Sequence, residues 1–202
     1  LAVMAAMYAV YHGPDGLRRI ATRVHALARS LARGLSEAGH CVVHTDFFDT
    51  LRVRPSEASV AKVLAAARER RINLRDLGDG TVGVALDETV DPEDLEDVMA
   101  SFGVEDPDAR ALAAGTEVTP LPKGLARSSS YLAHPVFNTH HSETEMLRYL
   151  HRLEAKDLSL TVSMIPLGSC TMKHTTTTEM EPVTWPEWSS LHPFAPPDQA
   201  AG

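Results

Sequence analysis

The chain has 202 residues, of which 44% are hydrophobic, enough for one core or for one domain plus part of another. Its formal net charge of -8 gives no global positive field that would attract nucleic acid or anionic lipid, although a local basic patch stays open. Two cysteines, Cys41 and Cys170, fit neither a disulfide framework nor a zinc spacing, which favours a reducing intracellular compartment. No segment approaches the roughly 18 apolar residues typical of a membrane span.

Two helices are predicted at the start of the chain. Residues 1–11 are apolar nearly all round, which indicates a helix buried against something and is interpreted as one cut open by a partial sequence. The motif His12-Gly13-Pro14 predicts a break. A second helix follows, with Gly39 as its C-terminal cap. Its apolar stripe consists of Leu17, Ile20, Val24, Leu27, Leu31 and Leu35.

Short strands and two further helices complete a compact unit. Strands are predicted at 41–43, 51–53, 72–74 and 81–86, with Gly78-Asp79-Gly80 as the turn between the last two. Ser56 is the expected cap of one helix, and Asp91 followed by Pro92 opens the other. Residues 1–103 therefore predict a small α+β domain of order helix-strand-strand-helix-strand-strand-helix.

The character of the sequence changes after Gly103. Residues 104–133 are rich in proline, glycine and serine and predict a linker, either flexible or wrapped on a neighbour. Ser142 and Glu145 form a capping-box motif at the start of a short helix. Beyond Leu160 the chain is polar and irregular, and Trp185 and Trp188 favour a tail laid over another domain rather than disorder.

No catalytic group stands out from spacing alone. The set His134, His140, His141, His174 and Cys170 lacks a metal-ligand spacing, since adjacent histidines point differently, so packing or substrate contact is favoured. Cys170 as a nucleophile beside a histidine has little support. The run 168–171 has the backbone and hydroxyl donors to hold an anion, but an ordinary polar loop is favoured. By pattern, Lys173 is not distinguished from a surface lysine.

Long stretches of the sequence resemble one family. Residues 134–149 (HPVFNTHHSETEMLRY), 163–173 (SMIPLGSCTMK), 182–187 (PVTWPE) and 191–196 (LHPFAP) look like successive motifs of the glycine cleavage system P-protein family. The stretch 7–14 (MYAVYHGP) is also similar to that family. The resemblance covers essentially the whole chain, in the right order and spacing.

The resemblance implies a fold and a division of the chain. The family is built from two homologous halves, each of the aspartate-aminotransferase-like fold (pyridoxal-phosphate fold type I). Residues 1–103 are then expected to be the small C-terminal domain of the first half and 104–133 a linker between halves. Residues 134–202 are expected to be the N-terminal arm and start of the second half. The chain is thus expected to be an internal fragment spanning the junction.

The resemblance also implies a reaction. The family uses pyridoxal phosphate as an electron sink to decarboxylate glycine, and passes the aminomethyl group to the lipoyl arm of H-protein. The expected partners are lipoylated H-protein and the remainder of the P-protein chain, in a homodimer, with neither nucleic acid nor membrane. A bacterial cytoplasm is the expected compartment, and a mitochondrial matrix is the alternative. A second hypothesis is a non-catalytic regulatory or structural partner that retains the fold.

The site residues are carried over from the family arm motifs. Ser169, Cys170 and Thr171 are expected to line the substrate and cofactor cavity, with Asn138, His140 and Lys173 nearby. A purely structural role is an equal alternative for each. The Schiff-base lysine belongs to a downstream histidine-lysine motif that is absent here, so the chain alone is expected to be inactive. His174 and the threonines at 175–178 replace the usual Leu-Asn and small residues, which predicts an altered turn and impaired function.

Overall fold

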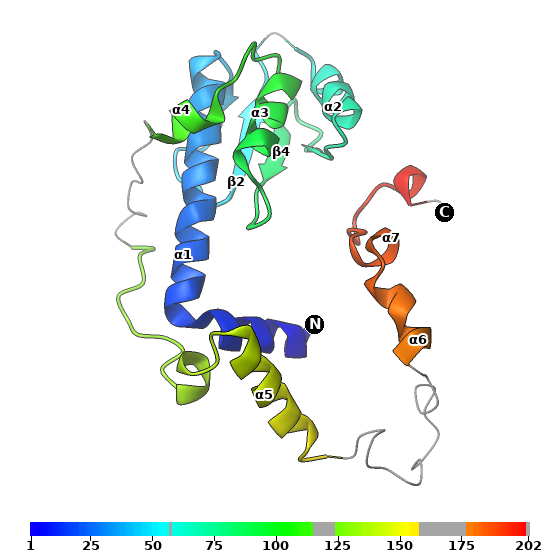
Figure 1. The fold of residues 1–202 in the computed structure, drawn as a ribbon. Helices are drawn as coiled ribbons and strands as arrows, with labels where there is room; N and C mark the ends of the chain where they lie inside the picture. The colour runs from blue at the N-terminus through cyan, green and yellow to red at the C-terminus, as the bar shows by residue number, and fades with distance from the viewer. Residues whose placement is uncertain (57, 115–123, 158–176, 201–202) are drawn as a thin grey trace. The chain divides into compact units, whose positions relative to one another are not determined.

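The computed structural model describes residues 1–56, 58–114, 124–157 and 177–200. The chain divides into two compact units, Leu1–His141 and Ser142–Gly202, described separately below. Figure 1 shows the first unit as helices beside a small sheet, with the short helices of the second unit following along the chain.

Helix α1 spans Ala2–Glu37 and is broken at Gly13, whose φ of 63° and ψ of -179° are not helical. Pro14 follows and has no backbone N–H to donate, so the two residues together end one helical limb and begin another. The predicted break at His12-Gly13-Pro14 is confirmed. Below, the first limb means residues 2–12 and the second limb means residues 14–37.

The second limb forms one side of the hydrophobic core. Its apolar stripe is buried as predicted from Val24 onward, and Leu31 and Leu35 are fully enclosed. The limb ends at Ala38, and Gly39 takes a φ of 88°, the left-handed conformation that terminates many helices. The predicted cap at Gly39 is therefore confirmed.

A four-stranded antiparallel sheet lies against the helices. Strands β1 (Cys41–Val42), β2 (Thr50–Arg54), β3 (Arg75–Asp76) and β4 (Val82–Ala85) are arranged in the order β1-β2-β4-β3. In the central pair, Leu51 faces Val84 and Val53 faces Val82, and all four side chains are buried. This alternation is the pattern of a sheet with one face on the core.

Two further helices, α2 (Val60–Glu69) and α3 (Pro92–Ser101), follow in the predicted order along the chain. The cap of α3 is the predicted one, since the side chains of Asp91 and Asp94 each accept a hydrogen bond from the other residue's backbone N–H. The predicted cap of α2 was wrong. Ser59 rather than Ser56 accepts the N–H of Lys62, while the backbone N–H of Ser56 donates to His40 Nδ1.

The predicted strand at 72–74 was also wrong in position. Residues 70–72 instead close the end of α2, because the N–H of Ile72 donates to the carbonyl of Ala67. Strand β3 begins only at Arg75. Beyond α3, a short helix α4 (Ala109–Ala114) and a 3-10 turn η1 (Pro135–Asn138) both pack against α1. Part of the segment predicted as a linker is thus ordered on the first unit.

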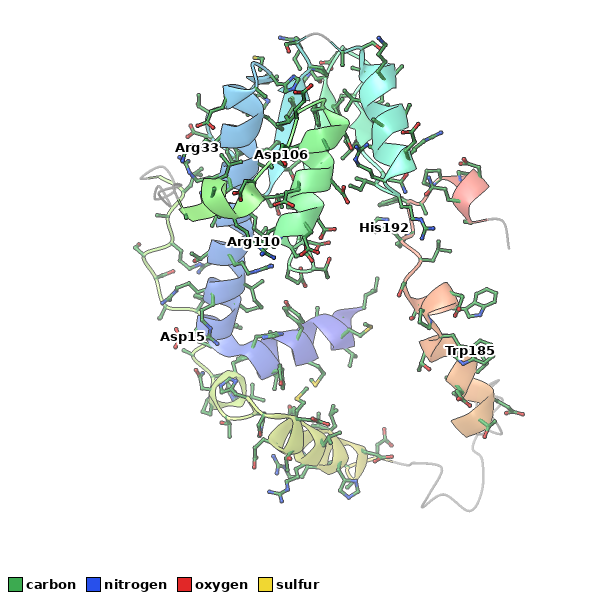
Figure 2. The ribbon with its side chains drawn as sticks, turned by 45° about the horizontal axis from the view of Figure 1, so that its top comes forward. Asp15, Arg33, Asp106, Arg110, Trp185 and His192 are labelled. Atoms are coloured by element: carbon green, nitrogen blue, oxygen red, sulfur yellow. The ribbon has the colours of Figure 1, made fainter. Side chains whose placement is uncertain are left out.

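The second unit consists of α5 (Glu143–Glu154), α6 (Thr177–Met180), η2 (Glu181–Thr184), α7 (Pro186–Ser189) and η3 (Pro197–Gln199). Ser142 caps α5 by accepting the N–H of Glu145, as its motif predicts. Trp185 (Figure 2) and Trp188 are 48% and 69% exposed, so the described residues of the second unit do not bury them. No helix among the described residues is long and apolar enough to cross a membrane.

Candidate functional site

Four of the six predicted site residues, Ser169, Cys170, Thr171 and Lys173, lie outside the described residues. His174, where the sequence departs from the family pattern, also lies outside them. The other two predicted residues, Asn138 and His140, belong to the first unit, next to the bend of α1. Their surroundings can therefore be compared with the prediction.

Asn138 ends η1 and stabilises the turn that carries it. Its Nδ2 donates to the carbonyl of Leu132 at 3.0 Å and to that of His134 at 3.1 Å. Leu132 has a φ of 51°, a left-handed conformation that costs a residue with a side chain about 1 kcal/mol or more. The amide of Asn138 thus holds a strained turn closed, and both of its N–H bonds have a structural task.

The adjacent histidines have different surroundings. His140 is buried, at 6% exposure, whereas His141 is exposed and its Nδ1 lies 2.7 Å from the carbonyl oxygen of Tyr11. A carbonyl only accepts, so Nδ1 of His141 must carry the proton. His134 has a third role, because its Nδ1 accepts the N–H of Val136 and caps η1. Capping accounts for His134, and a hydrogen bond to the backbone accounts for His141.

The described residues contain no group of three or more His, Cys, Asp or Glu side chains placed to hold a metal ion. A lysine that anchors pyridoxal phosphate does so as a Schiff base. A Schiff-base lysine is activated by removal from water in a pocket. Lys62 on α2 and Lys156 after α5, the lysines among the described residues, are both exposed on the surface. They do not fit the role of cofactor anchor.

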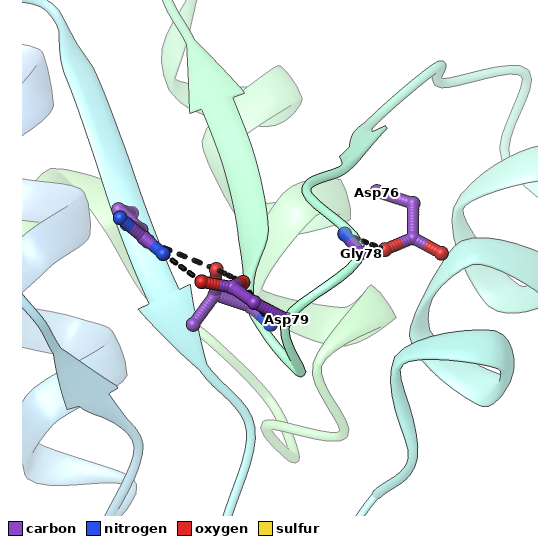
Figure 3. Close-up of polar contacts among 5 residues, drawn as sticks. Asp76, Gly78 and Asp79 are labelled. Carbon is purple, nitrogen blue, oxygen red and sulfur yellow. Dashed lines mark hydrogen bonds and ion pairs between the residues drawn. The ribbon is translucent and has the colours of Figure 1, made fainter.

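A polar cluster that the sequence did not single out joins β2 to the β3–β4 turn. Arg52 pairs with the carboxylate of Asp79, and its Nε donates to Thr81 Oγ1 at 3.0 Å. Asp79 also accepts the hydroxyl of Thr81, and Asp76 accepts the N–H of Gly78 at 2.8 Å (Figure 3). Because Arg52 is already paired, this cluster organises the predicted Gly78-Asp79-Gly80 turn and is not a ready anion receptor.

The loop after β4 contacts both limbs of α1. From the first limb, Tyr8 Oη donates to Glu88 Oε1 at 3.1 Å. From the second limb, Arg23 donates to the carbonyls of Glu88 at 3.1 Å and Val90 at 2.6 Å. Burial raises the pKa of Tyr8 above its ordinary value, and the hydrogen bond and the negative charge of Glu88 raise it further.

Comparison with known proteins decides the family. The family model of the glycine cleavage system P-protein matches residues 1–102, which run from α1 through the end of α3. The chain belongs to the glycine cleavage system P-protein family. A glycine dehydrogenase (decarboxylating) from Thermosynechococcus vestitus is 52% identical to it over all 202 residues. Those residues are 20% of that relative, so this P-protein chain spans about a fifth of its length.

The predicted resemblance to the P-protein family is thereby confirmed. The alignment with 52% identity covers all 202 residues, and so includes the second unit as well as the first. The α/β character of the first unit is confirmed, with a small antiparallel sheet beside helices. The aminotransferase-like architecture, the domain boundaries at 103 and 134 and the cavity-lining residues stay predictions.

Proposed function

We propose that this P-protein chain forms part of a glycine decarboxylase of the glycine cleavage system. The observation that carries the proposal is identity of 52% along the whole chain to a protein named glycine dehydrogenase (decarboxylating). In this proposal the complete enzyme uses pyridoxal phosphate to release CO2 from glycine and delivers the aminomethyl group to the lipoyl arm of H-protein. A bacterial cytoplasm, or a mitochondrial matrix, is the proposed setting.

Within that enzyme, residues 1–103 are proposed as the small domain that closes one aminotransferase-like half. Residues 104–133 link it to the arm of the second half, which begins near residue 134. The ordered contacts of α4 with α1 support a linker that is wrapped on the first half. The exposed indoles of Trp185 and Trp188 support an arm that packs on the remainder of the P-protein or on a second copy in a homodimer.

The proposed share of the active site is part of its wall. Ser169, Cys170 and Thr171 line the cavity, with Asn138, His140 and Lys173 nearby. Asn138 is proposed to shape this wall through the turn that it stabilises, and His140 through its buried position, rather than by touching glycine. This is supported by the two backbone hydrogen bonds of Asn138 and the burial of His140.

The absence of a cofactor lysine is tested by borohydride reduction. The 202-residue chain is incubated with pyridoxal phosphate, reduced, and analysed by peptide mass spectrometry. The expected result is no stoichiometric phosphopyridoxyl adduct, because Lys62 and Lys156 are surface residues and the anchoring lysine is proposed to lie outside this chain. A stoichiometric adduct at Lys173 would show that the chain binds the cofactor in its own right and would overturn this part of the proposal.

The departure at 174–178 is proposed to lower activity. A histidine in place of an apolar residue at a packed position costs stability unless its ring nitrogens find partners. Restoring the family residues with His174→Leu and Thr175→Asn in the complete enzyme is expected to raise the rate of glycine decarboxylation. Equal rates of glycine decarboxylation for the enzymes with and without the restored residues, at equal cofactor occupancy, would contradict the proposal.

A further inference from the structure

The bend of α1 leaves backbone carbonyls at its two edges. A helix ends with carbonyls that have no N–H partner within the helix, and Tyr11 lies in the last turn of the first limb. Pro14 opens the second limb, and its carbonyl, like any other, has two lone pairs. Asp15, labelled in Figure 2, marks the start of the second limb just past the bend.

A segment more than 100 residues further along the chain supplies donors to both carbonyls. Tyr131 Oη donates to the carbonyl of Pro14 at 2.6 Å, across a separation of 117 residues. His141 Nδ1 donates to the carbonyl of Tyr11 at 2.7 Å, across a separation of 130 residues. The two bonds bracket Gly13, so the segment binds the bend itself and not one limb only.

Two independent reasons require glycine at position 13, one from its backbone conformation and one from the space around it. Its φ of 63° with ψ near 180° belongs to a region open in practice only to glycine. A Cβ added there would also lie 2.6 Å from His141 Cε1 and 2.7 Å from the carbonyl oxygen of Phe137. The close approach of residues 131–141 to the bend therefore depends on the missing side chain.

Within the part of the chain that the structure describes, the first limb has few other contacts to fix its direction. Leu1, Val3 and Met4 are 101%, 73% and 70% exposed, whereas Val10, next to the bend, is 2% exposed. The hydrogen bond from Tyr8 to Glu88 lies at the surface, where such bonds contribute modestly. The buried contacts of the limb are thus concentrated at its hinge end.

We propose that residues 131–141 form a clasp that holds α1 bent at Gly13 and so sets the direction of the first limb. With the clasp closed, Tyr131 and His141 occupy the two carbonyls and η1 lies along α1 (Figure 1). With the clasp open, the first limb pivots about Gly13. The inference concerns a conformational device and does not depend on the proposed glycine decarboxylation.

The test measures the distance between the limbs by double electron–electron resonance. Nitroxides are placed by Met4→Cys and Ser36→Cys, both exposed positions, with Cys41→Ser and Cys170→Ser in the background. A straight helix would separate these Cα atoms by about 48 Å at 1.5 Å per residue. The expected result is a single narrow distribution at a shorter distance.

The clasp is opened with Tyr131→Phe combined with His141→Ala, which removes both donors. We expect the distribution to broaden by at least twofold in width, and Gly13→Ala to have the same effect. The matched control is Tyr149→Phe with His151→Ala on α5, the same chemical change in the second unit, which is expected to leave the distribution unchanged.

A narrow, unshifted distribution in the clasp variant would overturn the proposal and show that Gly13 and Pro14 fix the bend without help. If the double variant loses its helical circular dichroism, Tyr131→Phe alone is compared with Tyr149→Phe, since each removes a single oxygen atom. Broadening with Tyr131→Phe supports the clasp, and identical distributions contradict it.

Discussion

Tyr8 lies in the first limb of α1, where burial and the carboxylate of Glu88 raise the pKa of its hydroxyl. The folded state therefore favours the neutral phenol, while in the unfolded chain the phenol ionises near pH 10. This contribution to stability is fully present below about pH 10 and is lost as the pH rises through the folded pKa.

We predict that an absorbance titration at 295 nm contains a component that ionises above the ordinary tyrosine pKa, from Tyr8. Tyr8→Phe removes the late component, because Tyr8 is the group held neutral beside Glu88. Tyr11→Phe, in the same limb, serves as the matched control and keeps it. If the late component survives Tyr8→Phe, the assignment is wrong.

Leu31 tests the core at the scale of one side chain. It is fully buried between the second limb and the sheet, so Leu31→Ala leaves a cavity and is expected to lower the free energy of unfolding by about 2–5 kcal/mol. Leu125, in the same unit and 70% exposed, is the control, and Leu125→Ala is expected to change it by less than about 0.5 kcal/mol. Urea denaturation followed by circular dichroism measures both, and equal losses would contradict the assigned core.

Three helices of the first unit end in the same way. Just past each end, one residue takes a left-handed conformation: Gly39 after α1, Arg71 after α2 and Gly103 after α3. In each case the next N–H reaches back to the carbonyl five residues earlier, as from His40 to Leu35 and from Ile72 to Ala67. This is the Schellman motif, which glycine favours because it has no Cβ. Arg71 is the exception, with a φ of 62°.

Replacement of Arg71 by glycine is therefore expected to stabilise the first unit by up to about 1 kcal/mol, through relief of left-handed strain. The matched control is Arg68→Gly, three residues earlier inside α2, which is expected to destabilise it by about 1 kcal/mol. The two variants have the same composition, so thermal unfolding compares them directly. A loss of stability in both would contradict the assigned end of α2.

Helix ends that carry a typical capping residue were predicted correctly from the sequence. Asp91 with Pro92 located the start of α3, and Gly39 located the end of α1. The end of α2 was missed because an arginine occupies the position that glycine usually takes, so 72–74 was interpreted as a strand. The contacts of Tyr131 and His141 were missed because their acceptors are backbone carbonyls more than 100 residues away, which no local pattern reveals.

At the scale of the whole molecule, the function came from family motifs and not from spacing. The serine, cysteine and threonine at 169–171 look like an ordinary polar loop when taken alone. Asn138 was predicted near the cavity, and the structure shows a specific task for it that the motif does not state, the closure of the turn at Leu132. The chain spans about a fifth of the length of its relative, and the remaining groups of the site are proposed to lie outside it.

The central claim is that this chain is a working part of a glycine decarboxylase. The most direct test builds a chimera in which this chain replaces the aligned segment of the Thermosynechococcus vestitus glycine dehydrogenase. The two are 52% identical over 202 residues. Glycine-dependent exchange of labelled CO2 is measured at equal pyridoxal-phosphate occupancy, with and without His174→Leu and Thr175→Asn. We expect measurable exchange in the chimera and a higher rate in the restored form. A chimera that folds, binds the cofactor and remains inactive in both forms would contradict it and favour a non-catalytic partner that retains the fold.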